Sequence, residues 1–408
     1  MLKTKRILSI AMAFSFCFSM LNIGPVKAAG VSSGKASTTP IYLNTSYSFE
    51  ERAADLVSRM TLAEKASQMN SSTAPAIPRL GISSYGWWNE ALHGVSSMQL
   101  NSSGNASIVT NTTSYPIDLA LGSSWDPELM YREATMISDE AREVVPNNTR
   151  NLSFYSPTIN MARDPRWGRN DESYGEDPYL TTQIASQFVN GMEGKDMNGQ
   201  LLTKYNKTVT TLKHYALNNS EVNRLNGNSV TDERSLREYY TAAYKGIVEK
   251  ANVGSVMSSY NSINGIPSPV NVHLNDTLLR QTWGFNGYIT SDCDAVYEVS
   301  AGHKWIPDGW THAVNQIERA AFAVCAGEDL NCNTGYNDGN NYGNTIPTAV
   351  SQNITTDTGK FTENDVDTSL VRLFTARMKL GEFDDPNNVP WVTNARKSVP
   401  QGTWYLPL

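Results

Sequence analysis

The sequence lacks the motifs of several large enzyme classes. No G-x-G-x-x-G segment follows a predicted strand, which argues against a dinucleotide-binding sheet. No H-E-x-x-H motif or paired Cys/His spacing suggests a metal site, and neither a G-x-S-x-G elbow nor a Walker loop is present. We therefore expect no metal ion and no cofactor.

Clusters of positive charge and long apolar runs are also scarce. The net charge is −7, and no stretch of Lys and Arg is long enough to suggest binding to nucleic acid. Basic residues, an apolar run at 7–23 and small residues at 26–28 predict a signal peptide at 1–29, hence a secreted, extracellular protein. A transmembrane anchor is the alternative, but the run is short and interrupted by polar residues. No later stretch of about 18 apolar residues exists, so we expect a soluble mature protein without a membrane partner.

Cysteine is rare as well. The sequence has four cysteines, and Cys17 would be removed with the signal peptide. Cys293, Cys325 and Cys332 then remain, an odd number in an oxidising compartment. At most one intramolecular disulfide can form among them, and one thiol is left over.

The rest of the sequence has the composition and rhythm of one large globular domain. Hydrophobic residues make up 40% and charged residues 18% of the 408 residues. Short β-prone runs alternate with longer amphipathic runs, which predicts an α/β fold with parallel strands, here a (β/α)8 TIM-type barrel. We assign residues 30–48 to a flexible leader, 49–383 to the barrel and 384–408 to a linker or truncated tail. The predicted strands are a short run near Ile82, then 152–155, 209–212, 255–257 and 288–290. The predicted helices are 49–69 (two helices, the second capped by Thr61 and Glu64), 178–192, 235–250, 272–282, 311–325 and 365–379.

Polar side chains follow the predicted strands, where (β/α)8 barrels place their active sites. Glu90 comes just after Trp87 and Trp88, and a carboxylate beside two indoles is the composition of a sugar site. We expect Trp87 to contact the sugar, and a core pair of tryptophans with a surface glutamate is the alternative. Three arginines at 163–169 then offer a clamp for hydroxyls, and phosphate binding and a solvated loop are the alternatives for this segment.

Three further strands end in chemically useful residues. Lys213 and His214 follow the strand at 209–212, Tyr260 follows the next strand, and Asp292 stands where the strand at 288–290 ends. A lone histidine is often structural, and an aspartate before a helix can simply cap it. Because five successive strand ends carry such groups, we interpret them as one polar rim around Asp292.

Taken together, these segments resemble the family 3 glycoside hydrolases, in particular their β-xylosidase-like branch. The similar segments come in the family's order and span most of residues 50–380. They are W-W-N-E-A-L-H-G (87–94), R-D-P-R-W-G-R-N-D-E-S-Y-G-E-D (163–177), K-H-Y-A-L-N-N (213–219), S-S-Y-N-S-I-N-G (258–265), T-S-D-C-D-A-V (290–296) and A-G-E-D-L-N-C (326–332).

The resemblance implies a retaining mechanism in which Asp292 is the catalytic nucleophile and forms a covalent glycosyl–enzyme. It also implies a set of residues that hold the sugar of the first subsite. These are Glu90, Arg169, Lys213, His214 and Tyr260.

The same resemblance points to pentosides. Glu90 stands where the family's β-glucosidases typically have Asp. In the xylosidase branch, Cys293 pairs with the cysteine at the position of Cys332, which narrows the space for a hydroxymethyl group; Cys293–Cys325 is the rival pairing. The expected function is therefore exo-acting release of β-linked xylose from xylo-oligosaccharides in xylan breakdown. A β-glucosidase or α-L-arabinofuranosidase of the same family is the alternative.

The sequence departs from the family in one respect. A retaining glycosidase needs a second carboxyl group as acid/base, and most of the family carries it in a domain after the barrel, whereas this chain stops at Leu408. We expect a barrel with little activity, a non-catalytic sugar-binding fragment, or a chain that works with a missing or separately encoded C-terminal domain. The acidic residues considered inside the barrel, none of which an argument places opposite Asp292, are Asp177, Glu221, Asp294, Glu328 and Asp329.

Overall fold

The computed structural model describes residues 39–71, 74–100, 106–108, 112–144, 151–333 and 341–393. The chain divides into two units, Met1–Thr39 and Pro40–Leu408, and every element described below belongs to the second. The expected signal peptide lies outside the described residues.

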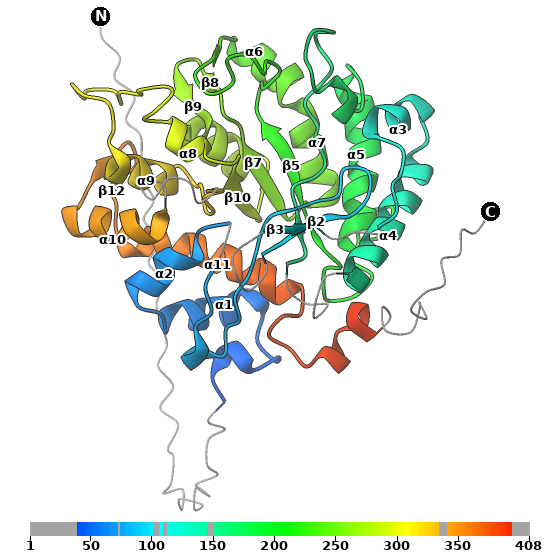
Figure 1. Cartoon of the computed structure of the whole chain (residues 1–408), viewed down its shortest axis with the longest axis horizontal. Helices are drawn as coiled ribbons and strands as arrows, with labels where there is room; N and C mark the ends of the chain where they lie inside the picture. Colours follow the sequence, from blue (N-terminus) through cyan, green and yellow to red (C-terminus); the bar gives the residue numbers. More distant parts are fainter. Residues whose placement is uncertain are drawn as a thin grey trace, which may run out of the picture. The chain divides into compact units, whose positions relative to one another are not determined.

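A four-stranded parallel sheet with the order β10-β7-β5-β4 forms the centre of this unit (Figure 1). Every residue of its strands is buried, as expected for parallel strands that are covered on both faces. The bounds are β4 (Ser153–Phe154), β5 (Val209–Tyr215), β7 (Ser255–Ser258) and β10 (Tyr288–Ser291).

Isolated backbone hydrogen bonds continue the wall from β10 round to β4. They join short segments that are not regular strands, and they comprise Ser291 N–H to Leu330 O (2.9 Å), Ser71 N–H to Asn331 O (2.9 Å), Trp87 N–H to Ser71 O (3.1 Å) and Tyr155 N–H to Asn89 O (2.7 Å). The α/β barrel predicted from the strand–helix rhythm is therefore confirmed, with part of its wall built from single bridges.

Helices surround the strands, with α4, α5 and α7 on one side and α9, α10 and α11 on another (Figure 1). The helices are α1 (Phe49–Ser58), α2 (Leu62–Gln68), α3 (Asp118–Ser124), α4 (Pro127–Val144), α5 (Pro178–Glu193), α6 (Glu233–Ser235), the π-helix η4 (Leu236–Tyr240), α7 (Ala242–Ala251), the π-helix η6 (His273–Thr282), α8 (Ala295–Glu298), α9 (Gln316–Cys325), α10 (Tyr342–Gln352) and α11 (Glu363–Lys379). None of the helices in the described ranges has both the length and the apolar character needed to span a bilayer.

Short elements complete the unit. Three small sheets contain β1 (Asn89–Glu90), β2 (Ser96–Leu100) and β3 (Ala106–Ile108); β6 (Asn228–Ser229), β8 (Ser262–Ile263) and β9 (Ile266–Pro267); and β11 (Thr355–Thr356) and β12 (Gly359–Lys360). The 3-10 turns are Ile41–Leu43, Pro78–Leu80, Asn170–Glu172, Ser268–Val270 and Pro386–Asn388.

The predicted helices and the strands from residue 152 onward are all present, whereas the predicted strand near Ile82 is only a single bridge to Ile77. Local capping explains several of the starts. The capping box of Thr61 and Glu64 begins α2, as predicted, and α1 has a second box made by Ser48 and Glu51. The predicted helix at 235–250 is split by a π-helical segment, and 272–282 is π-helical. Helices α3, α4, α8 and α10 were not predicted.

One glycine lets two of the surrounding helices approach closely. A Cβ at Gly191 in α5 would lie 2.6 Å from the carbonyl oxygen of Tyr131 and 2.8 Å from the Cβ of Ala134, both in α4. Real Cβ atoms do not come this close to backbone, so the α4–α5 contact requires glycine at this position.

The packed unit extends beyond both boundaries drawn from sequence. Tyr42 is buried, and its carbonyl accepts a hydrogen bond from Arg52 Nε (3.0 Å). The same guanidinium pairs with Asp384, and both side chains are almost fully buried. Val389 and Val392 are fully buried farther along the chain. Over these residues, the segments expected to be leader and linker are part of the barrel's packing.

Candidate active site

Asp292 follows the last residue of β10, so the strand delivers it to the carboxyl end of the barrel. Its backbone N–H donates to Ser258 O (2.9 Å), which continues the sheet, and its Oδ1 accepts from the N–H of Cys293 (2.8 Å). The first helix after it, α8, has Asp294 as its N-cap residue, without a side-chain cap. Asp292 is therefore not a helix cap, which was the structural alternative for this residue.

Burial and charge act in opposite directions on the Asp292 carboxyl group. Only 9% of the residue is exposed, and burial raises its pKa to about 6. The Cys293 N–H and the positive charges of Lys213, Arg169 and Arg224 lower the pKa and offset part of that effect. The second oxygen, Oδ2, has no hydrogen-bond partner among the described residues. A buried carboxylate with one unused oxygen, ringed by cations, is suited to act as a nucleophile.

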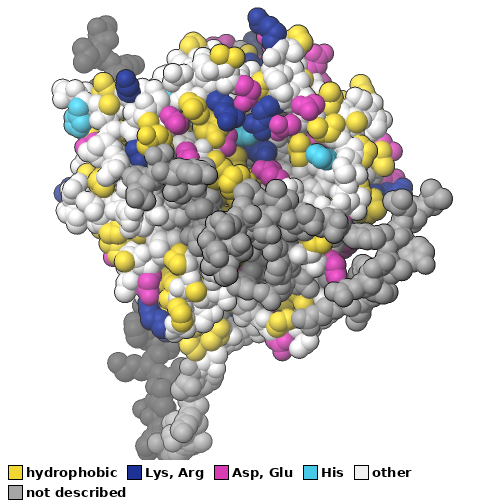
Figure 2. All heavy atoms as spheres, in the orientation of Figure 1, with side chains coloured by type: hydrophobic (Ala, Val, Ile, Leu, Met, Phe, Trp, Pro, Cys, Tyr) yellow, Lys and Arg dark blue, Asp and Glu magenta, His cyan; other side chains and the backbone are white. Residues whose placement is uncertain are grey.

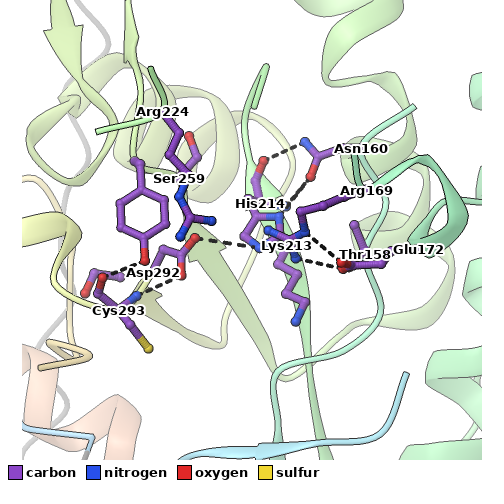
Figure 3. Close-up of polar contacts among 12 residues, drawn as sticks. Thr158, Asn160, Arg169, Glu172, Lys213, His214, Arg224, Ser259, Asp292 and Cys293 are labelled. Atoms are coloured by element: carbon purple, nitrogen blue, oxygen red, sulfur yellow. Dashed lines mark hydrogen bonds and ion pairs between the residues drawn. The ribbon is translucent and has the colours of Figure 1, made fainter. Parts of the chain in front are cut away.

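His214 faces that oxygen, with Nε2 3.6 Å from Asp292 Oδ2 (Figure 3). The imidazole is almost completely buried, and burial together with the charges of Arg169, Lys213 and Arg224 lowers its pKa well below the ordinary value. It is therefore neutral at physiological pH. On its other side, the ring contacts Asn160.

Lys213 lies beside His214 and pairs with Glu90, from β1, at 3.0 Å between Nζ and Oε2. Lys213 and His214 both lie at the carboxyl end of the barrel, although they are neighbours on one strand. The pairing of β5 with β7 shifts register between Leu212 and Tyr215, and such an irregularity redirects side chains. The Lys213–Glu90 pair leaves polar groups of both signs at the rim, where sugar hydroxyls need donors and acceptors.

Arg169 and Glu172 form a two-point pair on the other side of Lys213. Arg169 Nε and Nη2 each donate to a Glu172 oxygen at 2.7 Å, and Thr158 Oγ1 donates to the same carboxylate (3.1 Å). Burial raises the pKa of Glu172, but the Arg169 pair outweighs it, so the pKa falls below its ordinary value. Glu172 thereby fixes the guanidinium that contributes positive charge to Asp292.

Tyr260 and Arg224 close the site on the far side of Asp292. The Tyr260 hydroxyl donates to Cys293 O (2.7 Å), and burial and the Asp292 charge raise its pKa, which keeps the phenol protonated. The Arg224 guanidinium lies 4.7 Å from the centre of the Tyr260 ring, and Figure 3 shows it reaching toward Asp292. Sequence reasoning missed Arg224, because a single arginine in a loop carries no pattern of its own.

The surface around this site is rich in charge. Figure 2 shows Lys, Arg, Asp and Glu side chains gathered with a His above the centre of the pictured face. The predicted rim residues are thus brought together from separate segments of the barrel: Glu90, Arg169, Lys213, His214, Tyr260 and Asp292. Their roles in catalysis and binding stay predictions.

Comparison with known proteins decides the family. A model described as the glycosyl hydrolase family 3 N-terminal domain matches residues 99–376, more than half of the chain. The chain belongs to glycosyl hydrolase family 3. A xylan 1,4-β-xylosidase of Xylanibacter ruminicola is 35% identical over 371 residues, which are 88% of this chain and 39% of that protein. A probable exo-1,4-β-xylosidase of Aspergillus flavus is 36% identical over 369 residues, 87% of this chain and 44% of that protein.

Solved structures give the same picture of the family 3 fold. An exo-β-xylosidase of the family, in complex with a xylobiose aziridine activity-based probe, matches with a TM-score of 0.73 and 28% identity over 88% of this chain and 45% of that one. β-Glucosidase 3B of Thermotoga neapolitana, in complex with glucose, matches with a TM-score of 0.62 at 22% identity, over 84% of this chain and 45% of that one, a likeness in fold. The family 3 chain described here thus spans less than half the length of these relatives.

The expected sugar contact of Trp87 is wrong. Its ring is 1% exposed and packs in the core between Tyr85 (ring centroids 4.7 Å apart) and Tyr288 (5.1 Å). The neighbouring indole, Trp88, is half-buried and packs in a small cluster that includes Cys293, the residue after Asp292. Adjacent residues on an extended segment point to opposite sides, and the sequence did not reveal which of the two indoles faces the site.

The predicted disulfide is not formed in this family 3 chain, since Cys293, Cys325 and Cys332 are all free thiols. Cys293 and Cys332 nevertheless share one cluster and are hydrogen-bond partners, which, with burial, raises the pKa of Cys293. Cys325 lies elsewhere, near the hydroxyl of Thr356. The structure therefore brings together the two cysteines that the resemblance pairs and not the rival pair.

The acidic residues considered for a proton donor have other partners or surroundings. Asp177 caps α5, Asp329 is fully buried between two arginines, and Glu328 is fully buried beside it. Glu221 pairs with an arginine of its own loop, and Asp294 adopts a left-handed conformation at the start of α8. Among the described residues, no hydrogen bond or ion pair joins Asp177, Glu221, Glu328 or Asp329 to Asp292.

Proposed function

We propose that this chain carries the nucleophilic half of a retaining, exo-acting β-xylosidase that acts on xylo-oligosaccharides outside the cell. The observation that carries the proposal is the Asp292 carboxylate at the exit of β10, buried and ringed by Lys213, Arg169 and Arg224, with Oδ2 unused. The similarity to the named xylosidases supports the substrate class, and the apolar run at residues 7–23 supports export.

In the first step, an Asp292 oxygen bonds to the anomeric carbon of the terminal xylosyl unit as the bond to the leaving oxygen breaks. The leaving oxygen takes a proton from a general acid that is not among the acidic residues considered above. Water then attacks the anomeric carbon and gives up a proton to the conjugate base of the same general acid, and the bond to Asp292 breaks to release xylose with retained configuration. The three surrounding cations favour the ionised form of Asp292 that the first step needs.

A pentoside is favoured by what packs behind Asp292. Trp88, Cys293 and Cys332 form one cluster with Tyr155 and leave an apolar wall next to the nucleophile. We expect this wall to restrict space for the extra hydroxymethyl group of a hexose. Discrimination by one such group in an apolar pocket is worth about 10–200-fold.

An aryl β-xyloside with a strongly activated phenol tests the proposal, because such a leaving group needs little help from an acid. We expect a burst of phenol equal in amount to the protein, and a pentosyl adduct on the acid-quenched protein by mass spectrometry. The Asp292→Asn variant should give neither. The matching aryl β-glucoside should react at least about tenfold more slowly.

Two results would contradict parts of the proposal. A burst of equal size in Asp292→Asn would exclude Asp292 as the nucleophile. Binding of xylose without any burst in the unaltered protein would instead favour a sugar-binding protein that does not turn its ligand over.

A further inference from the structure

Asn160 contacts His214 at three points. The Asn160 amide nitrogen donates to His214 O (2.9 Å), and the His214 backbone N–H donates to Asn160 Oδ1 (2.7 Å). A backbone carbonyl can only accept and a backbone N–H can only donate, so these two bonds fix which end of the amide is which. The same Oδ1 lies 3.1 Å from His214 Nδ1.

This arrangement determines where the ring carries its proton. Oδ1 is an acceptor, so Nδ1 must be the protonated nitrogen if the 3.1 Å contact is to be a hydrogen bond. In a neutral imidazole, Nε2 then carries only a lone pair. Figure 3 shows that Asn160 lies on the opposite side of the ring from Asp292, so this lone pair points toward the carboxylate.

Two acceptors thus face each other across 3.6 Å, His214 Nε2 and Asp292 Oδ2. Oδ2 has no other hydrogen-bond partner among the described residues. A hydroxyl group that lies against both atoms can donate its single hydrogen to one of these two acceptors.

We propose that Asn160 is a positioning residue that holds His214 in its Nδ1-protonated tautomer, so that Nε2 accepts a hydrogen bond from a sugar hydroxyl. The inference rests on the proposed function for the identity of the ligand but not for the tautomer. It also excludes His214 as the proton donor to the leaving oxygen, because the nitrogen that faces Asp292 carries no proton to give.

The alternative is that Asn160 only joins its loop to β5. In that case the burst of phenol would not depend on which nitrogen of the His214 ring is protonated. The variant Asn160→Asp keeps the size of the side chain and an acceptor beside Nδ1, but it loses the amide donation to His214 O. The protonation pattern of the ring, and not a loss of rate alone, therefore separates the two roles. A carboxylate beside Nδ1 favours the doubly protonated imidazolium, and Nε2 then becomes a donor aimed at Asp292.

The groups that face this pair must be counted when pH dependence is the readout. His214 and Asp292 both face the positive Lys213, Arg169 and Arg224, and these are unchanged in the variant. The variant also adds a negative carboxylate, but on the opposite side of the ring from Asp292. The new positive charge on His214 is nearer, so it should lower the pKa of Asp292 by up to about one unit. The pH midpoint of the phenol burst should fall by the same amount.

Long-range nitrogen–proton NMR spectra of the imidazole rings give the direct test. The signals of His214 are identified by their loss in His214→Gln. We expect the Nδ1-protonated pattern in the unaltered protein and a doubly protonated ring in Asn160→Asp. The second-order rate constant of the burst should fall about tenfold in Asn160→Asp. This is the usual effect of reversing one hydrogen bond in a buried polar site.

Asn219→Ala is the matched control. Asn219 also bridges two loop segments through its amide, donating to Met161 O (2.8 Å), but it does not contact His214. It should leave the tautomer and the burst midpoint unchanged.

Two outcomes overturn the inference: an Nε2-protonated ring in the unaltered protein, or a ring and burst midpoint in Asn160→Asp that match the unaltered protein. A protein that shows the Nδ1-protonated ring but no burst would refute the proposed function and leave the positioning role of Asn160 intact.

Discussion

Replacing Asp292 with Asn should make the protein more stable at neutral pH while removing its chemistry. Burial raises the pKa of Asp292 from an ordinary 3.8 to about 6, so the folded protein binds this proton more tightly than the unfolded chain does. A carboxyl group with a raised pKa contributes most to stability when protonated, at low pH. That contribution is lost as the pH rises from about 4 through about 6.

The size of the effect follows from the shift. Two pKa units correspond to about 3 kcal/mol at pH 8, by which point the ionised form is fully populated. By the same linkage, ionisation of Asp292 costs about 1.6 kcal/mol of folding stability at pH 5. Asparagine carries no charge, and its amide nitrogen can donate to His214 Nε2 in place of the carboxylate oxygen that faces it at 3.6 Å. Asp292→Asn should therefore be stabilised by up to about 3 kcal/mol at pH 8 and by about half of that at pH 5.

Denaturant unfolding of both proteins between pH 5 and pH 8 measures this difference. Asp329→Asn is a suitable control, because Asp329 is fully buried and paired with Arg280 and Arg372. Breaking a buried pair leaves charge uncompensated, so this variant should lose about 3–5 kcal/mol. A stability difference for Asp292→Asn that stays constant with pH, or a loss of stability at pH 8, would refute the claim that burial outweighs the nearby cations and raises the pKa of Asp292.

Two further predictions concern the charge around the nucleophile and the packing of the helices. Lys213→Met removes a cation that lowers the pKa of Asp292, so the pH midpoint of the phenol burst should move upward, by about one unit; an unchanged midpoint would show that Lys213 does not act on Asp292. Gly191→Ala should lower the free energy of unfolding by about 1–3 kcal/mol in denaturant, because its Cβ would lie 2.6 Å from Tyr131 O. Gly168→Ala, with open space around it, should lower it little. Equal losses in the two variants would contradict the packing argument.

Local chemistry made much of the fold and part of the site predictable. The capping box of Thr61 and Glu64 and the apolar runs of the strands act over a few residues, so their signals survive in the sequence. Asp292 was also placed correctly at a strand exit, because the end of an apolar run marks that exit directly.

Features that depend on distant parts of the chain were not predictable in the same way. The wall between β10 and β4 consists of single bridges, which leave no period in the sequence. Trp87 lies just before the two-residue strand β1, and the side to which it points is set by packing against Tyr288. Tyr288 is far away in the sequence, so no local pattern reveals this contact. Asn160 and Arg224 act from loops, and only the folded barrel shows that they meet His214 and Asp292.

The bonds of Arg52 have a practical consequence for protein engineering. One guanidinium holds the carbonyl of Tyr42 and the carboxylate of Asp384, so two positions far apart in the chain are neighbours in space. Chains whose ends lie close together tolerate circular permutation, in which the old ends are linked and new ones are opened in a surface loop. A permuted barrel joined beside this arginine should keep its fold. A barrel trimmed just before Asp384 would instead leave the Arg52 guanidinium buried without its carboxylate partner.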